Sequence, residues 1–467
     1  MTATRAMTAL LLAGALSLAS ASGALAQKQS PPPVGPPKDF RLPAIRELTL
    51  PNGMAVTLVP FGRVPKVAVT LAVQAGRINE RADQVSLSDL TAALMEEGTR
   101  TRSAAALADE VAGMGGSLDV DAGSELTTIG GEVLAEHAAG MVRLVADVAR
   151  NPLLPSSELA RIKADQLRAL SIEKSQPQPI AQDRFRSVLY GDHPYGRVFP
   201  SERTVQGFTI DQVRTFHAAN FGARRAHLYV AGVFDAAATE AAIREAFGSW
   251  APGRPSVRPV PKPRMTRSLT LIDRPGAVQS TIMLGLPVPD PVEPDYVALQ
   301  VTDGLLGGAF GSRITTNIRE RKGYSYSPFS SVTNFYRQSY WAEQADVTTS
   351  ETGNSLKEIF GEIERLRSEA PPQAELHGIE RNLAGIFAVQ NSSRLGVIGQ
   401  LQFVDVQGLP DSYLTEYVKR VLAITPEQVR AMAQRHLRPD RMTIVVVGDR
   451  KTVAHQVAPY VRAPGGI

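Results

Sequence analysis

Short apolar runs open each half of the chain. Residues 54–60 and 67–76 in the first half, and residues 268–273 and 280–288 in the second, are rich in Val, Ile and Leu and end at turn residues. Such runs predict β-strands. In both halves longer segments follow, in which apolar residues recur three to four positions apart, the spacing of an amphipathic helix. This order predicts α+β domains, each a mainly antiparallel sheet packed against helices.

Two internal segments are similar to each other. Residues 209–232 and 425–448 align without a gap and share an initial Thr, the run Gln-Val-Arg, a later Arg and a Val-x-Gly ending. Each segment predicts a capped helix, a turn and a β-branched strand. The offset of 216 residues (425 minus 209) is about half of the chain. The sequence therefore predicts two duplicated domains and not a short-period solenoid.

A proline-rich segment separates the two halves. Residues 251–264 contain five prolines, which favour neither a helix nor a central strand and predict a semi-rigid linker. We therefore expect an N-terminal domain over residues 45–250, a linker over residues 251–265 and a C-terminal domain over residues 266–467.

The start of the chain differs in character from the rest. Arg5 precedes a short apolar stretch that ends in Ala24-Leu25-Ala26, the pattern of a secretory signal peptide over residues 1–26. Residues 27–44 predict a flexible N-terminal segment. No later run approaches the roughly 18 uninterrupted apolar residues of a membrane span. We expect an exported protein without a membrane span, periplasmic if the source is a Gram-negative bacterium.

Charge and cysteine content narrow the picture further. The chain has 50 Lys and Arg against 46 Asp and Glu, and the basic residues are scattered, so nucleic-acid binding is not expected. Because there is no cysteine, neither a disulfide nor a cysteine-linked lipid anchor can form.

A short helix is predicted between Ser86 and Thr99. Ser86-x-x-Asp89 is a capping-box-like start, Gly98 is a stop signal, and the leucines at positions 87, 90 and 94 would face the core. On these residues alone, it is a buried helix without catalytic groups.

Several motifs, in order along the chain, resemble those of the pitrilysin-like (M16) zinc peptidases, including the subunits of mitochondrial processing peptidase. They are the NGM-x-V run at 52–56, the helix ending at Gly98-Thr99, the segments 134–152 and 191–197, and RERKGYSY at 319–326. The resemblance covers nearly the whole chain after the predicted signal peptide. It implies a two-domain M16/LuxS-like fold.

The resemblance also implies a degenerate zinc motif. In active members the helix that ends at this Gly-Thr carries His-x-x-Glu-His, in which two histidines hold zinc and the glutamate activates water. Counted back from Gly98-Thr99, these positions are Asp89, Ala92 and Ala93.

The position of the third zinc ligand is degenerate as well. This glutamate of the family falls at Arg168 or Ala169, and the nearby Glu173 is out of register. We therefore expect neither zinc nor another cofactor in this chain, and we expect the zinc in a partner subunit.

The RERKGYSY segment allows two interpretations. Residues 298–321 carry an amphipathic pattern interrupted by Gly307-Gly308, and Gly323 ends it, so Tyr326 is expected beyond the helix. One interpretation is a helix end whose positive charges complement the helix dipole. The resemblance implies another, in which Arg319 and Tyr326 donate hydrogen bonds to a substrate carbonyl and to the developing oxyanion.

These features predict the metal-free subunit of a heterodimeric exported zinc peptidase. As the resemblance implies, a homologous partner would carry His-x-x-Glu-His. This chain would close a chamber over unfolded peptides and lend Arg319 and Tyr326 to the partner's site. The alternatives are a non-enzymatic scaffold or peptide-binding protein with a vestigial Arg/Tyr pair, and an autonomous metallopeptidase with unusual ligands.

Overall fold

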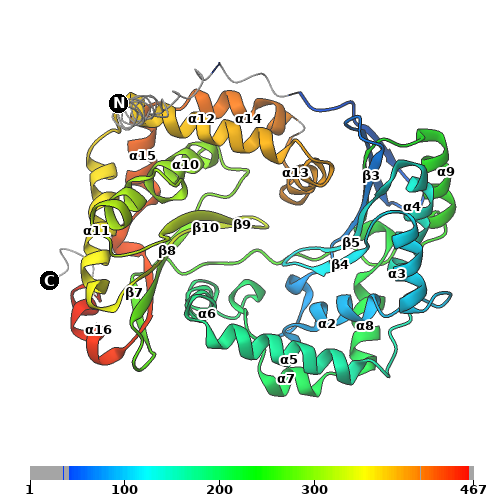
Figure 1. The fold of residues 1–467 in the computed structure, drawn as a ribbon, viewed down its shortest axis with the longest axis horizontal. Coiled ribbons are helices and arrows are strands. Elements are labelled where there is room, and N and C mark those ends of the chain that lie inside the picture. Colours follow the sequence, from blue (N-terminus) through cyan, green and yellow to red (C-terminus); the bar gives the residue numbers. More distant parts are fainter. Residues whose placement is uncertain (1–34, 36–40, 411, 462–467) are drawn as a thin grey trace, which may run out of the picture. The chain divides into compact units, whose positions relative to one another are not determined.

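Each predicted half contributes one β-sheet (Figure 1). The computed structural model describes residues 35, 41–410 and 412–461. Residues 39–467 form one unit, to which all that follows applies. The predicted signal peptide, residues 1–26, lies outside the described residues, as does most of the predicted flexible segment 27–44.

The first sheet has six strands in the order β1-β2-β6-β3-β5-β4, and every neighbouring pair except the parallel pair β2–β6 is antiparallel. The strands are β1 (Arg46–Thr49), β2 (Ala55–Pro60), β3 (Lys66–Val73), β4 (Asp119–Ala122), β5 (Thr127–Leu134) and β6 (Ala226–Gly232). Strands β2 and β3 form where the apolar runs predicted them, and their interiors are buried.

The second sheet has five strands in the order β7-β11-β8-β10-β9, with one parallel pair, β7–β11. The strands are β7 (Ser268–Asp273), β8 (Gln279–Val288), β9 (Phe329–Phe335), β10 (Gln338–Thr348) and β11 (Thr443–Gly448). Apart from the added edge strand β1, both sheets have the same sequence of parallel and antiparallel pairs. The predicted α+β class with two mainly antiparallel sheets is confirmed.

Helices flank both sheets, and among those the structure describes none has the length and apolar character that a membrane span requires. The first half contains α2 (Leu87–Met95), α3 (Ala104–Gly113), α4 (Ala138–Arg150), α5 (Leu159–Ser175), α6 (Pro177–Tyr190), α7 (Glu202–Gly207), α8 (Ile210–Asn220) and α9 (Ala236–Phe247). The second contains α10 (Tyr296–Asp303), α11 (Thr352–Ser368), α12 (Gln373–Gln390), α13 (Arg394–Gln407), α14 (Ser412–Leu422), α15 (Pro426–His436) and α16 (Arg450–Val457).

The internal repeat is confirmed at the level of side-chain caps. Thr209 caps α8 and Thr425 caps α15, each by accepting a hydrogen bond from the backbone N–H three residues on, and each forms a capping box with a glutamine, Gln212 or Gln428. The strands that follow, β6 and β11, occupy equivalent places in the two sheets.

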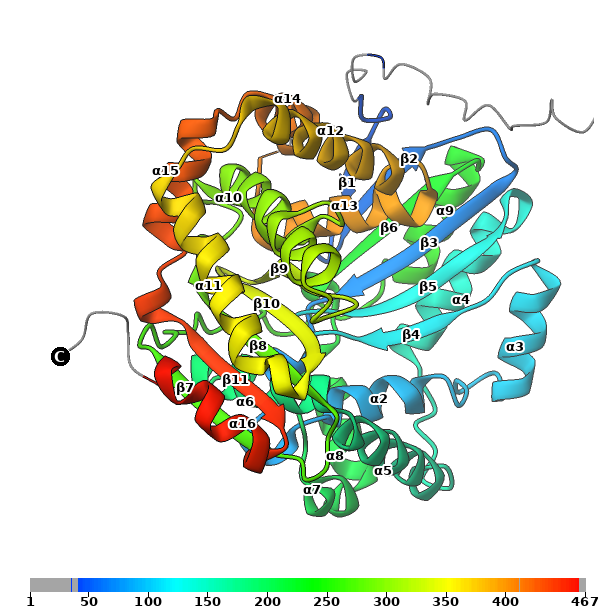
Figure 2. The same ribbon diagram turned by 60° about the vertical axis from the view of Figure 1, so that its left-hand side comes forward.

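The two halves exchange helices. Helix α6 of the first half packs on β8 and β11 of the second sheet, whereas α13 of the second half packs on β3 and β6 of the first sheet, as Figure 2 shows for α13. One apolar core accordingly contains Ala72 and Tyr229 together with Val397 and Leu401. The first half also has an apolar cluster of its own, from Leu50 to Trp250, but this other core is shared between the halves, so the domain limits 45–250 and 266–467 stay a prediction.

The proline-rich segment 251–265 contains no helix or strand. Its ends are nevertheless bound to the first half, because the N–H of Ala223 donates to the Ala251 carbonyl and the N–H of Arg264 donates to the Leu189 carbonyl. The segment is therefore held along the first half rather than free of it.

Candidate functional site

Helix α2 is capped by a buried glutamate and not by its own first residues. Ser86 has a left-handed backbone (φ +76°), and its hydroxyl donates to Asp89 instead of accepting from a helix N–H. The predicted capping box is therefore wrong. Glu80 takes this role: it accepts hydrogen bonds from the N–H of Ser86 (3.0 Å) and from the N–H and hydroxyl of Ser88 (2.8 and 2.6 Å). Burial raises the pKa of Glu80 to about 7, although these donors oppose the shift.

The three motif positions on α2 offer only one side chain with ligand atoms. Asp89 is engaged by Arg77, whose Nη2 donates to Oδ1 at 2.6 Å and whose Nε donates to Oδ2 at 3.2 Å. Ala92 is 4 % exposed and belongs to the core, and Ala93 packs against that core. A guanidinium, not a metal, thus neutralises the only carboxylate at the motif.

The positions expected for the third ligand lie on α5. Arg168 and Ala169 are exposed, and Arg168 donates to Asp165 at 2.6 Å. Glu173 is also exposed, and its charge acts on Arg77. Within the described ranges no three His, Cys, Asp or Glu side chains are grouped so that they could hold a metal ion. Two alanines and an arginine-paired aspartate do not fit zinc, which prefers nitrogen and thiolate ligands with at least three protein contacts.

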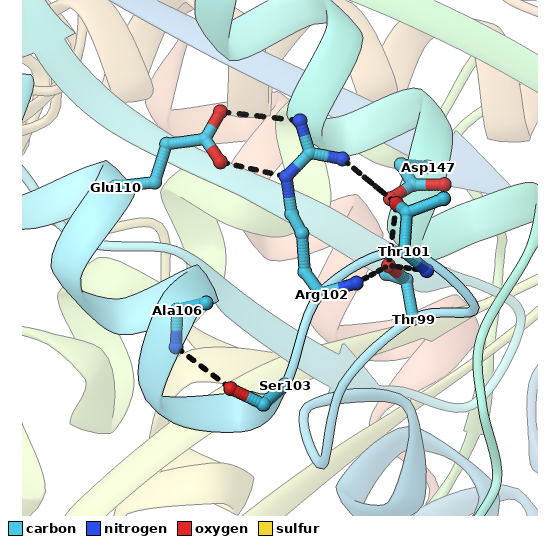
Figure 3. Close-up of polar contacts among 7 residues, drawn as sticks. All are labelled: Thr99, Thr101, Arg102, Ser103, Ala106, Glu110 and Asp147. Carbon is cyan, nitrogen blue, oxygen red and sulfur yellow. Dashed lines mark hydrogen bonds and ion pairs between the residues drawn. The ribbon is translucent and has the colours of Figure 1, made fainter.

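The turn after Gly98-Thr99, from which the motif positions were counted, is held to helices α3 and α4 by side-chain hydrogen bonds (Figure 3). Gly98 has φ +114°, and a Cβ there would lie 2.8 Å from the Arg102 carbonyl oxygen, so glycine is required. Arg102 donates through Nε to Glu110 of α3 (2.6 Å) and through Nη1 to Asp147 of α4 (2.8 Å). The end of the α2 segment is therefore fixed between α3 and α4.

Arg319 lies in a π-helical turn and not at the end of one long α-helix. The predicted helix over residues 298–321 is broken: α10 ends at Asp303, a π-turn follows at Gly304–Gly308, and a second π-turn spans Thr315–Arg321. The N–H of Lys322 donates to the carbonyl of Asn317, five residues earlier, at 3.0 Å. Such turns are frequent at functional sites.

Arg319 and Tyr326, the two predicted donors, lie in contact with each other. Gly323 (φ +67°) ends the turn, and Tyr326 lies in the loop before β9, 78 % exposed. The guanidinium carbon of Arg319 lies 4.9 Å from the centroid of the Tyr326 ring and 4.4 Å from that of Phe310. Its Nε is 3.2 Å from Glu320 Oε1. In the part of the chain described, no hydrogen bond or ion pair joins Arg319 or Tyr326 to α2.

Two buried carboxyl groups, Asp303 and Glu343, lie beside the π-turn at Gly304–Gly308, and they were not predicted from the sequence. Asp303 Oδ1 accepts from the Ser330 hydroxyl (2.5 Å) and from Trp341 Nε1 (2.7 Å). Glu343 on β10 is fully buried, and neither of its oxygens has a hydrogen-bond partner among the described residues. Burial raises the pKa of Asp303 to about 6, and burial together with the charge of Asp303 raises the pKa of Glu343 well above 4.5.

The two α+β halves, each with one mainly antiparallel sheet, define a two-domain fold of duplicated type. The chain belongs to peptidase family M16. The sequence model described as insulinase (peptidase family M16) matches residues 62–199, and the one described as peptidase M16 inactive domain matches residues 207–383. The predicted family is thereby confirmed.

Relatives and solved structures agree with this assignment. An uncharacterized zinc protease of Mycobacterium bovis is 27 % identical over 415 residues, which cover 87 % of this chain and 93 % of that protein. A crystal structure of a peptidase M16 inactive domain from Pseudomonas fluorescens has a TM-score of 0.79 at 26 % identity and covers 87 % of this chain and 98 % of its own. A protease from Helicobacter pylori (TM-score 0.80, 21 % identity, 87 % and 100 % covered) shares the fold.

Proposed function

We propose that this chain is the metal-free subunit of a heterodimeric, exported M16 metallopeptidase. A homologous partner would carry His-x-x-Glu-His and the zinc ion, and the two chains would enclose unfolded peptides. This chain would supply Arg319 and Tyr326 to the substrate at the partner's zinc. The observation that carries the proposal is the contact between Arg319 and Tyr326 on a chain whose motif positions are two alanines and an aspartate paired with Arg77.

The chemistry of α2 supports a division of labour. Hydrolysis by a zinc peptidase needs a bound water and a base to take its proton. At the position of that base stands Ala92, and the carboxylate of Asp89 is paired with Arg77. These residues offer neither function, so the cleavage step in this proposal belongs to the partner.

The Arg/Tyr pair is suited to the complementary task. A guanidinium stays protonated and a phenol has one O–H to donate, so neither serves as a base at neutral pH. Donors aimed at a developing oxyanion are worth about 3 kcal/mol each, or on the order of 100-fold in rate. The exposure of Tyr326 suits a group that acts on a molecule outside its own chain.

The location in the proposal rests on the predicted signal peptide. A chain exported across the inner membrane of a Gram-negative bacterium without a membrane anchor would work in the periplasm. Its partner would carry a similar leader, and its substrates would be unfolded peptides that fit between the two chains.

Reconstitution with an exported His-x-x-Glu-His homologue tests the proposal. We expect the mixture to cleave unfolded peptides, each chain alone to be inactive, and Arg319→Ala or Tyr326→Phe to lower kcat on the order of 100-fold. Arg321→Ala is the matched control, because Arg321 lies in the same turn and contacts neither ring among the described residues. Assembly is followed by gel filtration in every case.

The same experiment separates the other two functions. Complex formation with unchanged cleavage in both variants would indicate a scaffold with a vestigial pair. Cleavage by the isolated chain that a chelator abolishes would indicate an autonomous metallopeptidase. Either outcome contradicts the proposed role of Arg319 and Tyr326.

A further inference from the structure

Phe310 is an exposed aromatic residue whose position invites an explanation. It lies between the two π-turns, its ring is 74 % exposed, and the Arg319 guanidinium carbon is 4.4 Å from the ring centroid. Because the ring of Phe310 stays mostly in water, it gains little of the free energy that burial of a phenylalanine provides. What its position does provide is a contact with the guanidinium of Arg319.

The stacking of Arg319 on aromatic rings determines which of its hydrogen-bond donors stay available. Guanidinium groups stack on aromatic rings through their faces, whereas their N–H donors point outward in the plane of the group. In the part of the chain described, the only polar partner of the Arg319 side chain is Glu320, at Nε. Two rings thus hold the side chain without using its terminal nitrogen donors.

A flexible arginine side chain would bind a substrate less tightly than one already held in its binding rotamer. Fixing a long side chain in one rotamer costs conformational entropy. Rings that hold the guanidinium before substrate arrives lower this cost at the time of binding. Tyr326 supplies one ring as well as its own hydroxyl, and Phe310 supplies a ring alone.

We propose that Phe310 is a positioning residue that fixes the Arg319 guanidinium beside Tyr326, with its terminal N–H groups directed to a peptide carbonyl. The inference rests on the proposed function for its purpose, but the positioning itself is measurable on the isolated chain. The ligand class is a hydrogen-bond acceptor of the peptide main chain.

Chemical modification of arginine tests the positioning without a partner. The full chain is treated with phenylglyoxal, and mass spectrometry gives the rate at Arg319 relative to Arg321, which serves as an internal reference in the same turn. A cation–π contact at an exposed site is worth about 0.5–1 kcal/mol, so Phe310→Ala should raise this ratio about two- to five-fold. Phe310→Tyr should restore the wild-type ratio.

Phe329→Ala is the matched control, because Phe329 is a nearby aromatic, 54 % exposed, that contacts no guanidinium among the described residues. Equal melting temperatures show that all variants fold. An unchanged ratio in Phe310→Ala, or an equal rise in Phe329→Ala, would overturn the inference.

Cleavage by the reconstituted pair then distinguishes the two proposals. If both hold, Phe310→Ala lowers kcat about two- to five-fold with little change in KM, and Phe310→Tyr recovers it. If Arg319 becomes more reactive while kcat is unchanged, Phe310 positions Arg319 as inferred but the proposed catalytic role of Arg319 fails.

Discussion

Glu343 is a fully buried carboxyl group with no basic side chain acting on it. Replacing Glu343 by glutamine tests whether this carboxyl group is protonated in the folded chain. Neither of its oxygens makes a hydrogen bond of good geometry among the described residues; the backbone N–H of Phe329 alone acts to lower its pKa, and no Lys, Arg or His acts on its charge. Asp303 lies close by: a Cβ on Gly307 would be 2.6 Å from Glu343 Oε2, and one on Gly308 would be 2.6 Å from Asp303 Oδ2. Glu343→Gln keeps the size of the side chain and removes its titration.

The magnitude follows from proton linkage. A carboxyl group whose pKa is raised on folding binds its proton more tightly in the folded chain, and while only the unfolded chain has ionised, stability falls by about 1.4 kcal/mol per pH unit. The unfolded chain releases its proton first, so stability falls as the pH rises from 4.5 to 7. The raised pKa of Asp303, about 6, acts in the same direction from pH 3.8 upward. We therefore expect the stability of Glu343→Gln relative to wild type to increase as the pH rises above 4.5, by at most about 1.4 kcal/mol per pH unit, and to differ little at pH 4.5.

Urea unfolding between pH 4.5 and pH 8 measures this difference. Trp341, whose Nε1 donates to Asp303, reports on the site by its fluorescence. Glu416→Gln, an exposed change on α14, is the control and should leave the pH profile of wild type unaltered. A stability difference between Glu343→Gln and wild type that is the same at every pH would refute the reasoning, as would a loss of stability at pH 7.

Three further changes have expected outcomes. Gly307→Ala should lower the free energy of unfolding in urea by about 1–3 kcal/mol, because the added Cβ would lie 2.5 Å from the Ser330 hydroxyl. The control Gly311→Ala has no atom within 4 Å of its Cβ and should lower it by less than about 1 kcal/mol. Glu80→Ala removes three hydrogen bonds at the start of α2 and should lower the free energy of unfolding by about 2 kcal/mol. Installing His-x-x-Glu-His on α2 should not create a tight zinc site, because the third ligand is missing; one equivalent of zinc retained after dialysis, by elemental analysis, would contradict this.

Local sequence patterns predicted the strands well. Strand β7 spans the residues of its apolar run, 268–273, and β8 differs from its run by one residue. The N-terminal caps of α8 and α15 could also be predicted, because the Thr and the Gln of each capping box are three residues apart in the sequence. All these features depend on neighbours within one turn or one strand.

The features that escaped prediction depend on residues distant in the chain. Glu80 caps α2 from a preceding loop, and Arg77 pairs with Asp89 twelve residues further on. The exchange of α6 and α13 follows from packing between halves, which one-dimensional periodicity does not encode. The π-turns were missed because a π-turn and an α-turn show similar apolar spacing over a few residues.

The stability of the fold accounts for the residues at the motif positions of α2 better than it accounts for Arg319 and Tyr326. Ala92 fills the core and Asp89 is paired with Arg77, so the motif positions of α2 have structural roles that need no metal. Arg319 and Tyr326 differ, because an exposed cation–π contact adds only about 0.5–1 kcal/mol to stability and leaves a large ring in water. Stability alone thus gives little reason for two exposed rings around one arginine in a π-helical turn. Recognition of a molecule outside the chain, as proposed for Arg319 and Tyr326, gives a better one.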